Sequence, residues 1–516
     1  MSAAAGPAQP APLSGVTLAA VSIALALGTF MQILDTTIAN VSLTTIAGNL
    51  GASSDSSTWI ITAFAVANGV TVPLTGWLMG RFGVVRTFVV SVILFTIASL
   101  LCGIAWSLPS LIAFRILQGG VSGPMIPGSQ ALLISIFPAE KRATALGIWS
   151  MTTLTGPVMG PILGGYISDN YHWGWIFLIN IPFGLVSAFI SWRFMKSRET
   201  ATRKLPVDMV GLGLLAFWVG TLQCVLDLGK NADWFNSTHI VLLALLSAIG
   251  FVAWLIWELT DARPAVDLRL FTNRNFALGT AALTLGFAIF FGNTLLLPLW
   301  LQTQLGYTAT WAGLVSAPSG VVSVLATPIV ARLSGKIEPR IMATFAFVAF
   351  TASFFMRSGY TAQADYWHFM LPLAVQGLAM STFLVSMLNI SLDGVPAEKL
   401  PSATGLSNFA RITGSSFAAS IVTTMWDRRE ALHQSRLVDH SSVFDPVFQQ
   451  GMAALGQLGL NGHQAAGAIT RQMIGQAYLL SSIDLFHASA LAMMAMIALV
   501  WLARKPAPVS GPVAAD

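Results

Sequence analysis

Long apolar segments recur through almost the entire chain, and they limit its possible folds more than any other feature. We count fourteen such segments of roughly 20 residues, each long enough as a helix to cross a bilayer core of about 30 Å. Only 9% of the residues are charged, against about 25% in an ordinary soluble domain. An open strand in lipid leaves its backbone groups without hydrogen-bond partners, so each segment is predicted to be a helix. The sequence therefore predicts an all-α polytopic membrane protein and excludes a soluble enzyme or a disulfide-rich secreted scaffold.

The predicted spans are joined by short connections, apart from one long segment near the C-terminus. Both cysteines, Cys102 and Cys224, lie inside spans, so no disulfide framework is expected. The predicted spans cover residues 16–48, 57–79, 87–106, 109–136, 143–167, 174–195, 207–227, 239–258, 276–301, 310–331, 341–358, 366–392, 403–425 and 483–503.

Lysine and arginine are concentrated on one side of the predicted membrane. With the N-terminus inside, 18 of the 26 basic residues fall in cytoplasmic loops or flanks, and only Lys230 and Arg357 fall in short outer loops. Cytoplasmic loops of membrane proteins are enriched in these residues. Both termini are therefore predicted to be cytoplasmic.

Short matches at one offset of 258 residues indicate an internal repeat. They are Gln118-Gly119 with Gln376-Gly377, Pro138-Ala139-Glu140-Lys141 with Pro396-Ala397-Glu398-Lys399, and Ala145 and Gly147 with Ala403 and Gly405. An even number of predicted spans separates the copies, so they share one orientation, as parallel repeats do. We expect a six-helix bundle at 1–200, two linking helices at 201–262, and a second six-helix bundle at 263–516 with a long periplasmic loop at about 426–482.

Asp35 is the most informative single residue, because its carboxyl group lies inside the first span. An ionisable group there costs roughly 2.5–3.5 kcal/mol on insertion scales. One side of this helix, at about 100° per residue, carries the polar residues Gln32, Asp35, Thr36, Asn40 and Ser42. We expect that side to face the bundle interior or a water-filled cavity. Desolvation favours a neutral carboxyl group, which suits reversible protonation. The alternative is a structural polar contact.

Arg115 is the natural counterpart of Asp35. Counted at 1.5 Å per helical residue, Arg115 lies roughly 33 Å and Asp35 roughly 28 Å from the cytoplasmic side. These similar depths permit the two side chains to form a pair. Protonation of Asp35 would then leave the guanidinium without its partner and convert a proton into a conformational change. The alternative is a cation that extends toward the outer surface.

Four further polar residues are candidates for a cavity: Gln32, Asn40, Gln118 and Arg411. Arg411 lies some 10 residues from the cytoplasmic end of its span, so its side chain could instead extend to that surface. The seven histidines show no metal-ligand spacing, and no nucleotide-binding loop is present. No metal or cofactor is predicted, so energy for any transport must come from an ion gradient or a partner.

The fifth span contains a spaced set of glycines with one proline: Gly147, Gly156, Gly160, Pro161, Gly164 and Gly165. Glycines let neighbouring helix backbones approach closely, and proline removes a backbone hydrogen bond. Tight packing of this helix, with a kink at the proline, is the expectation.

That glycine spacing resembles the antiporter motif of drug-exporting major facilitators. The residues Leu34 to Val41 are similar to the first-helix signature of the 14-helix drug:proton antiporters, and Arg115, Gln118 and Gly119 fit their fourth-helix motif. A loop after the second helix is also similar to the family's gating loop, through Gly76, Arg81, Gly83 and Arg86. It departs from the family pattern at Gly80, where an Asp is usual, and at Val84-Val85.

The resemblance implies proton-driven export of amphipathic or hydrophobic compounds, with Asp35 and Arg115 in proton coupling. It also implies a bacterial inner membrane and two partners, a periplasmic adaptor and an outer-membrane channel. The 426–482 segment is then either an adaptor contact or a disordered spacer. Three alternative functions remain open: export of one metabolite or fatty acid, import of a nutrient, and a scaffold that transports nothing.

Overall fold

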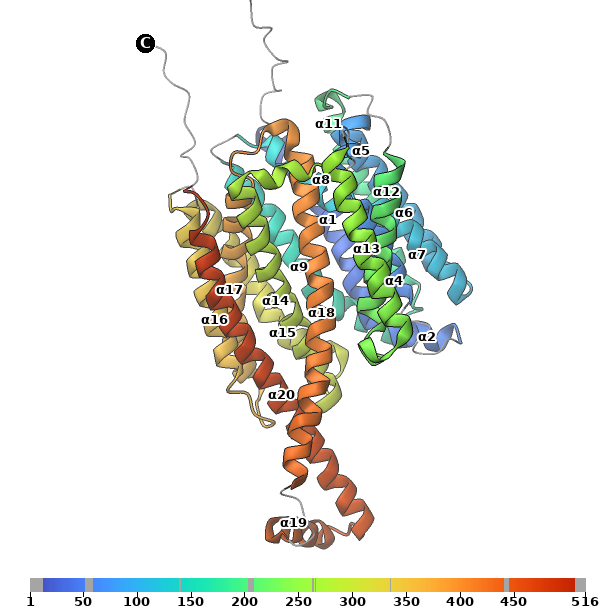
Figure 1. The fold of residues 1–516 in the computed structure, drawn as a ribbon, viewed down its shortest axis with the longest axis vertical. Helices are drawn as coiled ribbons and strands as arrows, with labels where there is room; N and C mark the ends of the chain where they lie inside the picture. Colours follow the sequence, from blue (N-terminus) through green and yellow to red (C-terminus); the bar gives the residue numbers. More distant parts are fainter. Residues whose placement is uncertain are drawn as a thin grey trace, which may run out of the picture.

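The computed structural model describes residues 13–51, 59–138, 141–202, 208–261, 264, 266–334, 336–439 and 445–505. Throughout these residues the secondary structure is helical, without a β-strand. Most of the helices stand side by side along the long axis of the molecule (Figure 1). The architecture agrees with the all-α class that the apolar segments predict.

Three groups of helices follow one another along the chain. The first half consists of α1 (Gly15–Val41), α2 (Leu43–Asn49), α4 (Trp59–Thr71), α5 (Thr75–Phe82), α6 (Val84–Gly103), α7 (Leu108–Ser122), α8 (Met125–Ile136), α9 (Arg142–Asn170), α10 (Trp175–Leu178) and α11 (Asn180–Met195). The linking pair consists of α12 (Met209–Leu228) and α13 (Thr238–Thr260). The second half consists of α14 (Arg274–Gln304), α15 (Ala309–Leu333), α16 (Pro339–Arg357), α17 (Tyr366–Ser391), α18 (Leu400–Asp439), α19 (Pro446–Gln457) and α20 (Gly462–Trp501). Short 3-10 turns are η2 (Lys196–Arg198), η3 (Trp234–Asn236), η4 (Leu268–Thr272) and η5 (Ala397–Lys399).

Ten helices of the described chain are long and apolar enough to cross a membrane, or 11 if the bent pair α4–α5 is one span. Three further predicted spans, at 109–136, 143–167 and 403–425, correspond to the pair α7–α8, to α9 and to α18. They stand within the same bundle (Figure 1), but they are not among those ten. The count of fourteen spans therefore stays a prediction.

Four predicted spans are divided in the structure. The sixth span, at 174–195, divides into α10 and α11 at Ile179. The second bends by 58° between α4 and α5, beside Pro73, which has no backbone N–H to donate. The fourth divides into α7 and α8 at Gly123-Pro124. The first divides into α1 and α2 at Ser42. Predicting these spans from hydropathy alone did not reveal the breaks, because hydropathy is insensitive to backbone hydrogen bonds.

The two halves pack against each other through equivalent glycines. A Cβ atom on Gly147 of α9 would lie 3.1 Å from the Ala331 side chain of α15. A Cβ atom on Gly405 of α18 would likewise lie 3.1 Å from the Thr75 side chain of α5. These glycines are matched at the repeat offset, so the halves exchange the same contact, as a twofold relation between parallel repeats requires.

These contacts lie at the end of the bundle where α1 begins and α20 finishes, which we call the terminal end. Hydrogen bonds join the halves there as well. The Thr404 hydroxyl donates to the Pro127 carbonyl over 3.2 Å, and the Asn408 amide donates to the Gln130 side chain over 2.9 Å. The halves are thus held together by several side-chain contacts at the terminal end.

At the opposite end, α18 and α20 continue beyond the bundle as a helical hairpin with α19 at its tip (Figure 1). The hairpin is held by contacts between its two arms. Trp426 packs on Tyr478 with ring centroids 4.5 Å apart, and Asp484 accepts from His433 over 2.8 Å. The described part of the 426–482 segment is therefore helical rather than a disordered spacer. Residues 440–444 lie outside the described residues.

Candidate functional site

The side chains of Asp35 and Arg115 meet inside the first half. Nη1 of Arg115 on α7 lies 2.6 Å from Oδ2 of Asp35 on α1. Both residues are 0% exposed. The similar predicted depths of the two residues allowed an ion pair without establishing it. In the structure the ion pair is formed.

Two side-chain amides complete the surroundings of the Asp35 carboxylate. Nε2 of Gln118 on α7 and Nδ2 of Asn180 on α11 each donate to Oδ1 over 2.9 Å. Both amides also donate to the hydroxyl oxygen of Ser99 on α6, over 2.8 and 3.3 Å. One buried network thus joins four helices, and the carboxylate accepts three hydrogen bonds within it.

The Arg115 guanidinium is itself held on several sides. Its Nε donates to the Ile60 carbonyl oxygen over 3.1 Å, and its Nη1 donates to Gln118 over 2.7 Å. The Phe64 ring lies 4.3 Å from the guanidinium carbon, and the Phe177 ring lies 5.5 Å from it. Aromatic faces attract a cation, so the guanidinium is fixed in position before any change at Asp35.

This arrangement suits a charged carboxylate. A proton on Asp35 would remove the negative charge that faces Arg115 and leave a buried guanidinium without its counter-charge. Removing one partner of a buried pair costs about 3–5 kcal/mol. The charge on Asp35 and the packing of α1 against α7 are therefore linked through this ion pair.

Sequence reasoning missed Ser99 and Asn180, although both are 0% exposed members of this network. The available signal was that Asn180 is an amide within an apolar run, just before Pro182. Uncharged polar residues are common in membrane helices, so that signal alone does not separate Asn180 from the others.

The remaining candidate polar residues of the first half are distributed differently from the expectation. Gln118 lies in the buried network within the first half rather than in a cavity between the halves. Gln32 is 3% exposed, and its Oε1 has no hydrogen-bond partner in the part of the chain that the structure describes. The side chain of Asn40 lies outside the described residues.

The glycine motif packs α9 onto α1 next to Asp35. A Cβ atom on Gly156 would overlap the Ile33 side chain, and one on Gly160 would overlap the Thr37 side chain. The Thr37 hydroxyl donates to the Gly156 carbonyl oxygen over 3.3 Å. The close approach of the two backbones therefore requires glycine at both positions, which face the residues two before and two after Asp35 on α1.

The other motif residues extend this contact in both directions. Gly164 faces Ile38 on α1, where an added Cβ would lie 3.0 Å away, and Gly165 is buried. Helix α9 continues through Pro161 as a single element, and the proline ring lies outside the described residues. Three glycines of the motif, Gly156, Gly160 and Gly164, therefore lie in the α1–α9 interface.

The predicted gating loop forms two different contacts. Gly76 approaches the second half, and a Cβ atom there would overlap Ser402 of α18. Gly83 has φ +95, a conformation that favours glycine. The guanidinium of the half-buried Arg81 lies 5.6 Å from the Trp77 ring, and Arg86 is exposed.

Glu199, which sequence reasoning missed, binds this loop from beyond the end of α11. Its carboxylate accepts from the backbone N–H of Val85 over 3.0 Å and of Arg86 over 2.8 Å. These are free donors at the start of α6, where a negative charge is favourable. The carboxylate on this loop therefore comes from a distant segment, while Gly80 stands where the family has an Asp.

Arg411 does not extend to the terminal end. It is 6% exposed, and its Nη2 donates to Asn408 Oδ1 over 2.9 Å. Its guanidinium lies 4.5 Å from the Phe287 ring. Arg357, which was expected in a short outer loop, is 0% exposed as the last residue of α16.

Comparisons with known proteins agree with this geometry. The profile of the Major Facilitator Superfamily matches residues 25–419. The chain is 45% identical to the multidrug export protein EmrB of Haemophilus influenzae, over 96% of this chain and 97% of that protein. The chain belongs to the EmrB family of major facilitators.

Two further similarities bear on this family. The chain is 44% identical to the fatty acid resistance protein FarB of Neisseria gonorrhoeae, over 96% of this chain and 98% of that protein. The solved structure of the proton:xylose symporter XylE has a TM-score of 0.56, covers 90% of this chain and 94% of that chain, and is 15% identical. That likeness shows the major facilitator fold.

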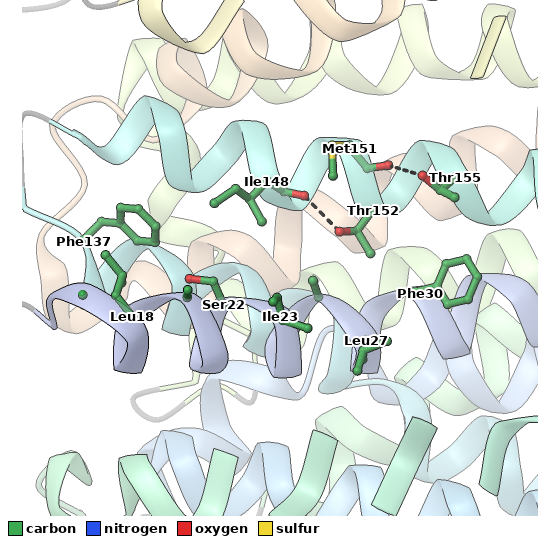
Figure 2. Close-up of a pocket in the computed structure, with 13 residues that line it drawn as sticks. Leu18, Ser22, Ile23, Leu27, Phe30, Phe137, Ile148, Met151, Thr152 and Thr155 are labelled. Atoms are coloured by element: carbon green, nitrogen blue, oxygen red, sulfur yellow. Dashed lines mark hydrogen bonds between the residues drawn. The ribbon is translucent and has the colours of Figure 1, made fainter. Parts of the chain in front are cut away.

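This major facilitator also has a lateral groove of about 600 Å³ beside α1 and α9 (Figure 2). The hydroxyls of Thr152 and Thr155 there donate to their own helix, to the carbonyls of Ile148 and Met151. The groove lining contains no charged residue, so the groove offers nothing that could bind a proton. In the described residues, no group of three or more His, Cys, Asp or Glu side chains could hold a metal ion.

Proposed function

We propose that the protein is a proton-driven multidrug efflux antiporter. It exchanges protons moving inward for amphipathic or hydrophobic compounds moving outward, and its activity is transport rather than an enzymatic reaction. The identity to a multidrug export protein supports the export of drugs. The buried pair of Asp35 and Arg115 is the single observation that carries proton coupling.

The proposed setting is a bacterial inner membrane with both termini in the cytoplasm. The fourteen spans are arranged as six at 1–200, two at 201–262 and six at 263–516. A reporter that is active only in the periplasm, fused after Tyr307, should be active, and one fused after Lys336 should be silent. The reverse pattern would overturn this orientation.

In this orientation the terminal end is cytoplasmic, so the contacts of Thr404 and Asn408 hold the halves closed toward the cytoplasm. Protonation of Asp35 weakens its pairing with Arg115 and lets α1 shift against α9 along the glycine face. One charge that crosses 100 mV supplies about 2.3 kcal/mol, enough for a solute gradient of roughly 50-fold. The substrate binds between the halves near the midplane, as in other transporters built from repeats.

The proposed partners are a periplasmic adaptor of the EmrA type and an outer-membrane channel of the TolC type. The helical hairpin supports an adaptor contact, because its tip lies beyond the bundle. On and beside α19, which contains no buried residue, Val447 is 76% exposed and Leu458 is 79% exposed. The adaptor is the occupant that we propose for this tip.

The test of proton coupling is transport by Asp35→Asn in vesicles with an imposed pH gradient. The variant should insert and fold, yet lose proton-driven efflux of a hydrophobic dye. Thr303→Ala, near the exposed end of α14, serves as the control and should transport normally. Full activity of the Asn variant would exclude Asp35 as the coupling group.

A second candidate function is export of fatty acids or of one amphipathic metabolite. The 44% identity to a fatty acid resistance protein favours it. A panel of drugs, dyes and fatty acids in the same vesicles separates the two candidates. Accumulation that requires an inward pH gradient would instead indicate a nutrient importer, and indifference to the gradient would indicate a scaffold.

A further inference from the structure

Arg411 is a buried cation that faces both halves of the protein and has no acidic partner. Among the described residues it makes one side-chain hydrogen bond, to Asn408 of its own helix, and no ion pair. Its guanidinium lies 4.5 Å from the Phe287 ring of α14 and 6.0 Å from the Trp149 ring of α9. A guanidinium has five N–H donors in a planar fork, so most of its donor capacity is unused.

Other donors beside Arg411 also lack acceptors. The indole Nε1 of Trp149 and the amide Nε2 of Gln130 are buried, and neither has a hydrogen-bond partner within the described ranges. Asn408 connects Gln130 to Arg411, because its Nδ2 donates to Gln130 Oε1 and its Oδ1 accepts from Arg411, each over 2.9 Å. We call Gln130, Trp149, Asn408 and Arg411 the donor cluster. Its unused groups are all hydrogen-bond donors.

An unpaired buried donor, above all a charged one, raises the free energy of the folded protein. The group that would relieve the donor cluster is a hydrogen-bond acceptor with a negative charge. A carboxylate meets this need best, since its two oxygens match the guanidinium fork. A cationic group would be repelled by Arg411.

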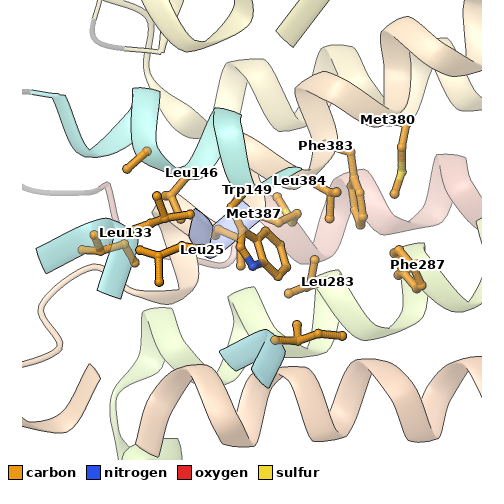
Figure 3. Close-up of a cluster of buried hydrophobic side chains, with 14 of the residues drawn as sticks. Leu25, Leu133, Leu146, Trp149, Leu283, Phe287, Met380, Phe383, Leu384 and Met387 are labelled. Carbon is orange, nitrogen blue, oxygen red and sulfur yellow. The ribbon is translucent and has the colours of Figure 1, made fainter. Parts of the chain in front are cut away.

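The surroundings of the donor cluster are apolar. Figure 3 shows the Trp149 ring among side chains of α14 and α17, including Leu283, Phe287, Leu384 and Met387. Methionine and aromatic side chains adapt to hydrocarbon groups of different shape. The combination of one cation with an adaptable apolar lining fits a molecule that has a charged head and a hydrophobic body.

The donor cluster also lies where transport requires a binding site. Gln130 and Trp149 belong to the first half, whereas Asn408 and Arg411 belong to the second. The Asn408–Gln130 hydrogen bond is one of the contacts that join the halves at the terminal end. A molecule bound here therefore touches both halves and the contact between them.

We infer that the donor cluster binds the anionic group of amphipathic substrates, with Arg411 as the residue that selects for negative charge. This inference rests on the proposed transport function and specifies the substrate class. Arg411 and Trp149 hold the carboxylate or an equivalent anionic group, and the side chains of α14 and α17 contact the hydrocarbon part.

The test compares three probes that share one tail: dodecanoate, dodecanol and dodecyltrimethylammonium. Their binding is measured on the purified full-length protein in lipid nanodiscs, and their transport is measured in proteoliposomes with a pH gradient. The wild-type protein should bind dodecanoate most tightly. Arg411→Gln should weaken dodecanoate binding by about 10- to 100-fold, the range expected when a charge-assisted hydrogen bond is lost, and should leave dodecanol binding within about 3-fold.

Two more variants separate charge from fold. Arg411→Lys keeps the charge and should retain the preference for dodecanoate over dodecanol. Trp149→Phe removes the indole N–H together with part of the ring, and it should weaken dodecanoate binding by about 2- to 10-fold but dodecanol binding less. Arg436→Gln on the exposed hairpin arm is the matched control and should bind all three probes as the wild-type protein does. If Arg411→Gln does not fold, dodecanoate binding by Arg411→Lys and Trp149→Phe tests the inference instead.

An Arg411→Gln protein that keeps the wild-type preference for dodecanoate would overturn the inference. So would a Trp149→Phe protein with unchanged dodecanoate binding if the Gln variant cannot be folded. Failure of the proposed function has a different signature, in which the wild-type protein moves none of the probes in response to the pH gradient. If only the inference about Arg411 is wrong, the wild-type protein still transports the probes in response to the pH gradient. The preference for the anionic probe is then the same with and without Arg411.

Discussion

The two halves share a repeated arrangement of helices, but at two matched positions the first half buries charged side chains and the second half buries uncharged ones. At the repeat offset, Asp35 corresponds to Asn293 and Arg115 corresponds to Leu373. The first pair of positions forms a buried ion pair. In the second half, Asn293 donates to the Ser489 hydroxyl over 2.8 Å, and no ion pair is present at these positions. At these matched positions the first half therefore holds an ion pair, and the second half holds two uncharged side chains.

The second half instead buries aromatic side chains around the matched region. Phe350 packs edge-on against Phe383 with ring centroids 5.8 Å apart, and Phe290 lies 5.9 Å from Phe350. Arg411 borders this apolar interior beside Phe287. The comparison supports a division of labour in which the first half binds the proton and the second half provides most of the surface for the hydrophobic substrate.

The largest effect is expected when the charged residues of the first half are replaced by the residues at the matched positions of the second half. Arg115→Leu copies Leu373 and leaves the Asp35 carboxylate buried without its cation, so it should lower the free energy of unfolding by about 3–5 kcal/mol. Adding Asp35→Asn, which copies Asn293, removes the unpaired charge and should recover most of that stability. Transport should stay lost in the double variant.

Unfolding of the wild-type protein, both single variants and the double variant in detergent gives the coupling energy of the pair. If the double variant is no more stable than Arg115→Leu, the charges are not what distinguishes the halves. If it transports with the pH gradient, coupling does not depend on this pair.

A smaller effect is expected from the glycine face. Gly160 corresponds to Ala418 at the repeat offset. Gly160→Ala places a methyl group against Thr37 and should cost about 1–3 kcal/mol through overpacking. Ala418→Gly should cost about 1 kcal/mol, because it only lowers helix propensity. Thermal unfolding of both variants measures the difference, and equal losses would show that α9 does not pack on α1 more tightly than α18 packs on its neighbours.

The smallest effects concern the contact that each half makes between the residues after its last helix and the beginning of a neighbouring helix. Glu199 after α11 accepts two backbone N–H groups of α6, whereas Lys505 after α20 lies 3.8 Å from Glu338 beside α16. Glu199→Ala should cost about 0.5–2 kcal/mol, as loss of a helix cap does. Lys505→Ala should cost about 0–1 kcal/mol, because its side chain is 71% exposed. A larger loss at Lys505 in the same unfolding assay would reverse this ranking.

Much of the fold could be predicted because hydropathy acts locally along the chain. The helical class follows from the apolar runs, and Asp35 and Arg115 were identifiable because charges in such runs are rare. The breaks at Ser42, Pro73 and Gly123-Pro124 were missed, since hydropathy does not register backbone hydrogen bonds. The burial of Arg357 was also missed, because it depends on the Phe354 and Phe486 rings that surround the guanidinium.

The sequence by itself determined that this chain forms apolar helices, that short motifs repeat at one offset, and that one acid and one arginine lie within apolar segments of the first half. These properties depend on residue type and spacing, which can be read without knowing the fold. Only the tertiary structure decided that Asn180 and Ser99 join the ion pair, that Glu199 binds the start of α6, and that Arg411 meets Trp149 between the halves. Contacts between distant segments depend on the relative placement of whole helices, and a one-dimensional pattern does not specify that placement.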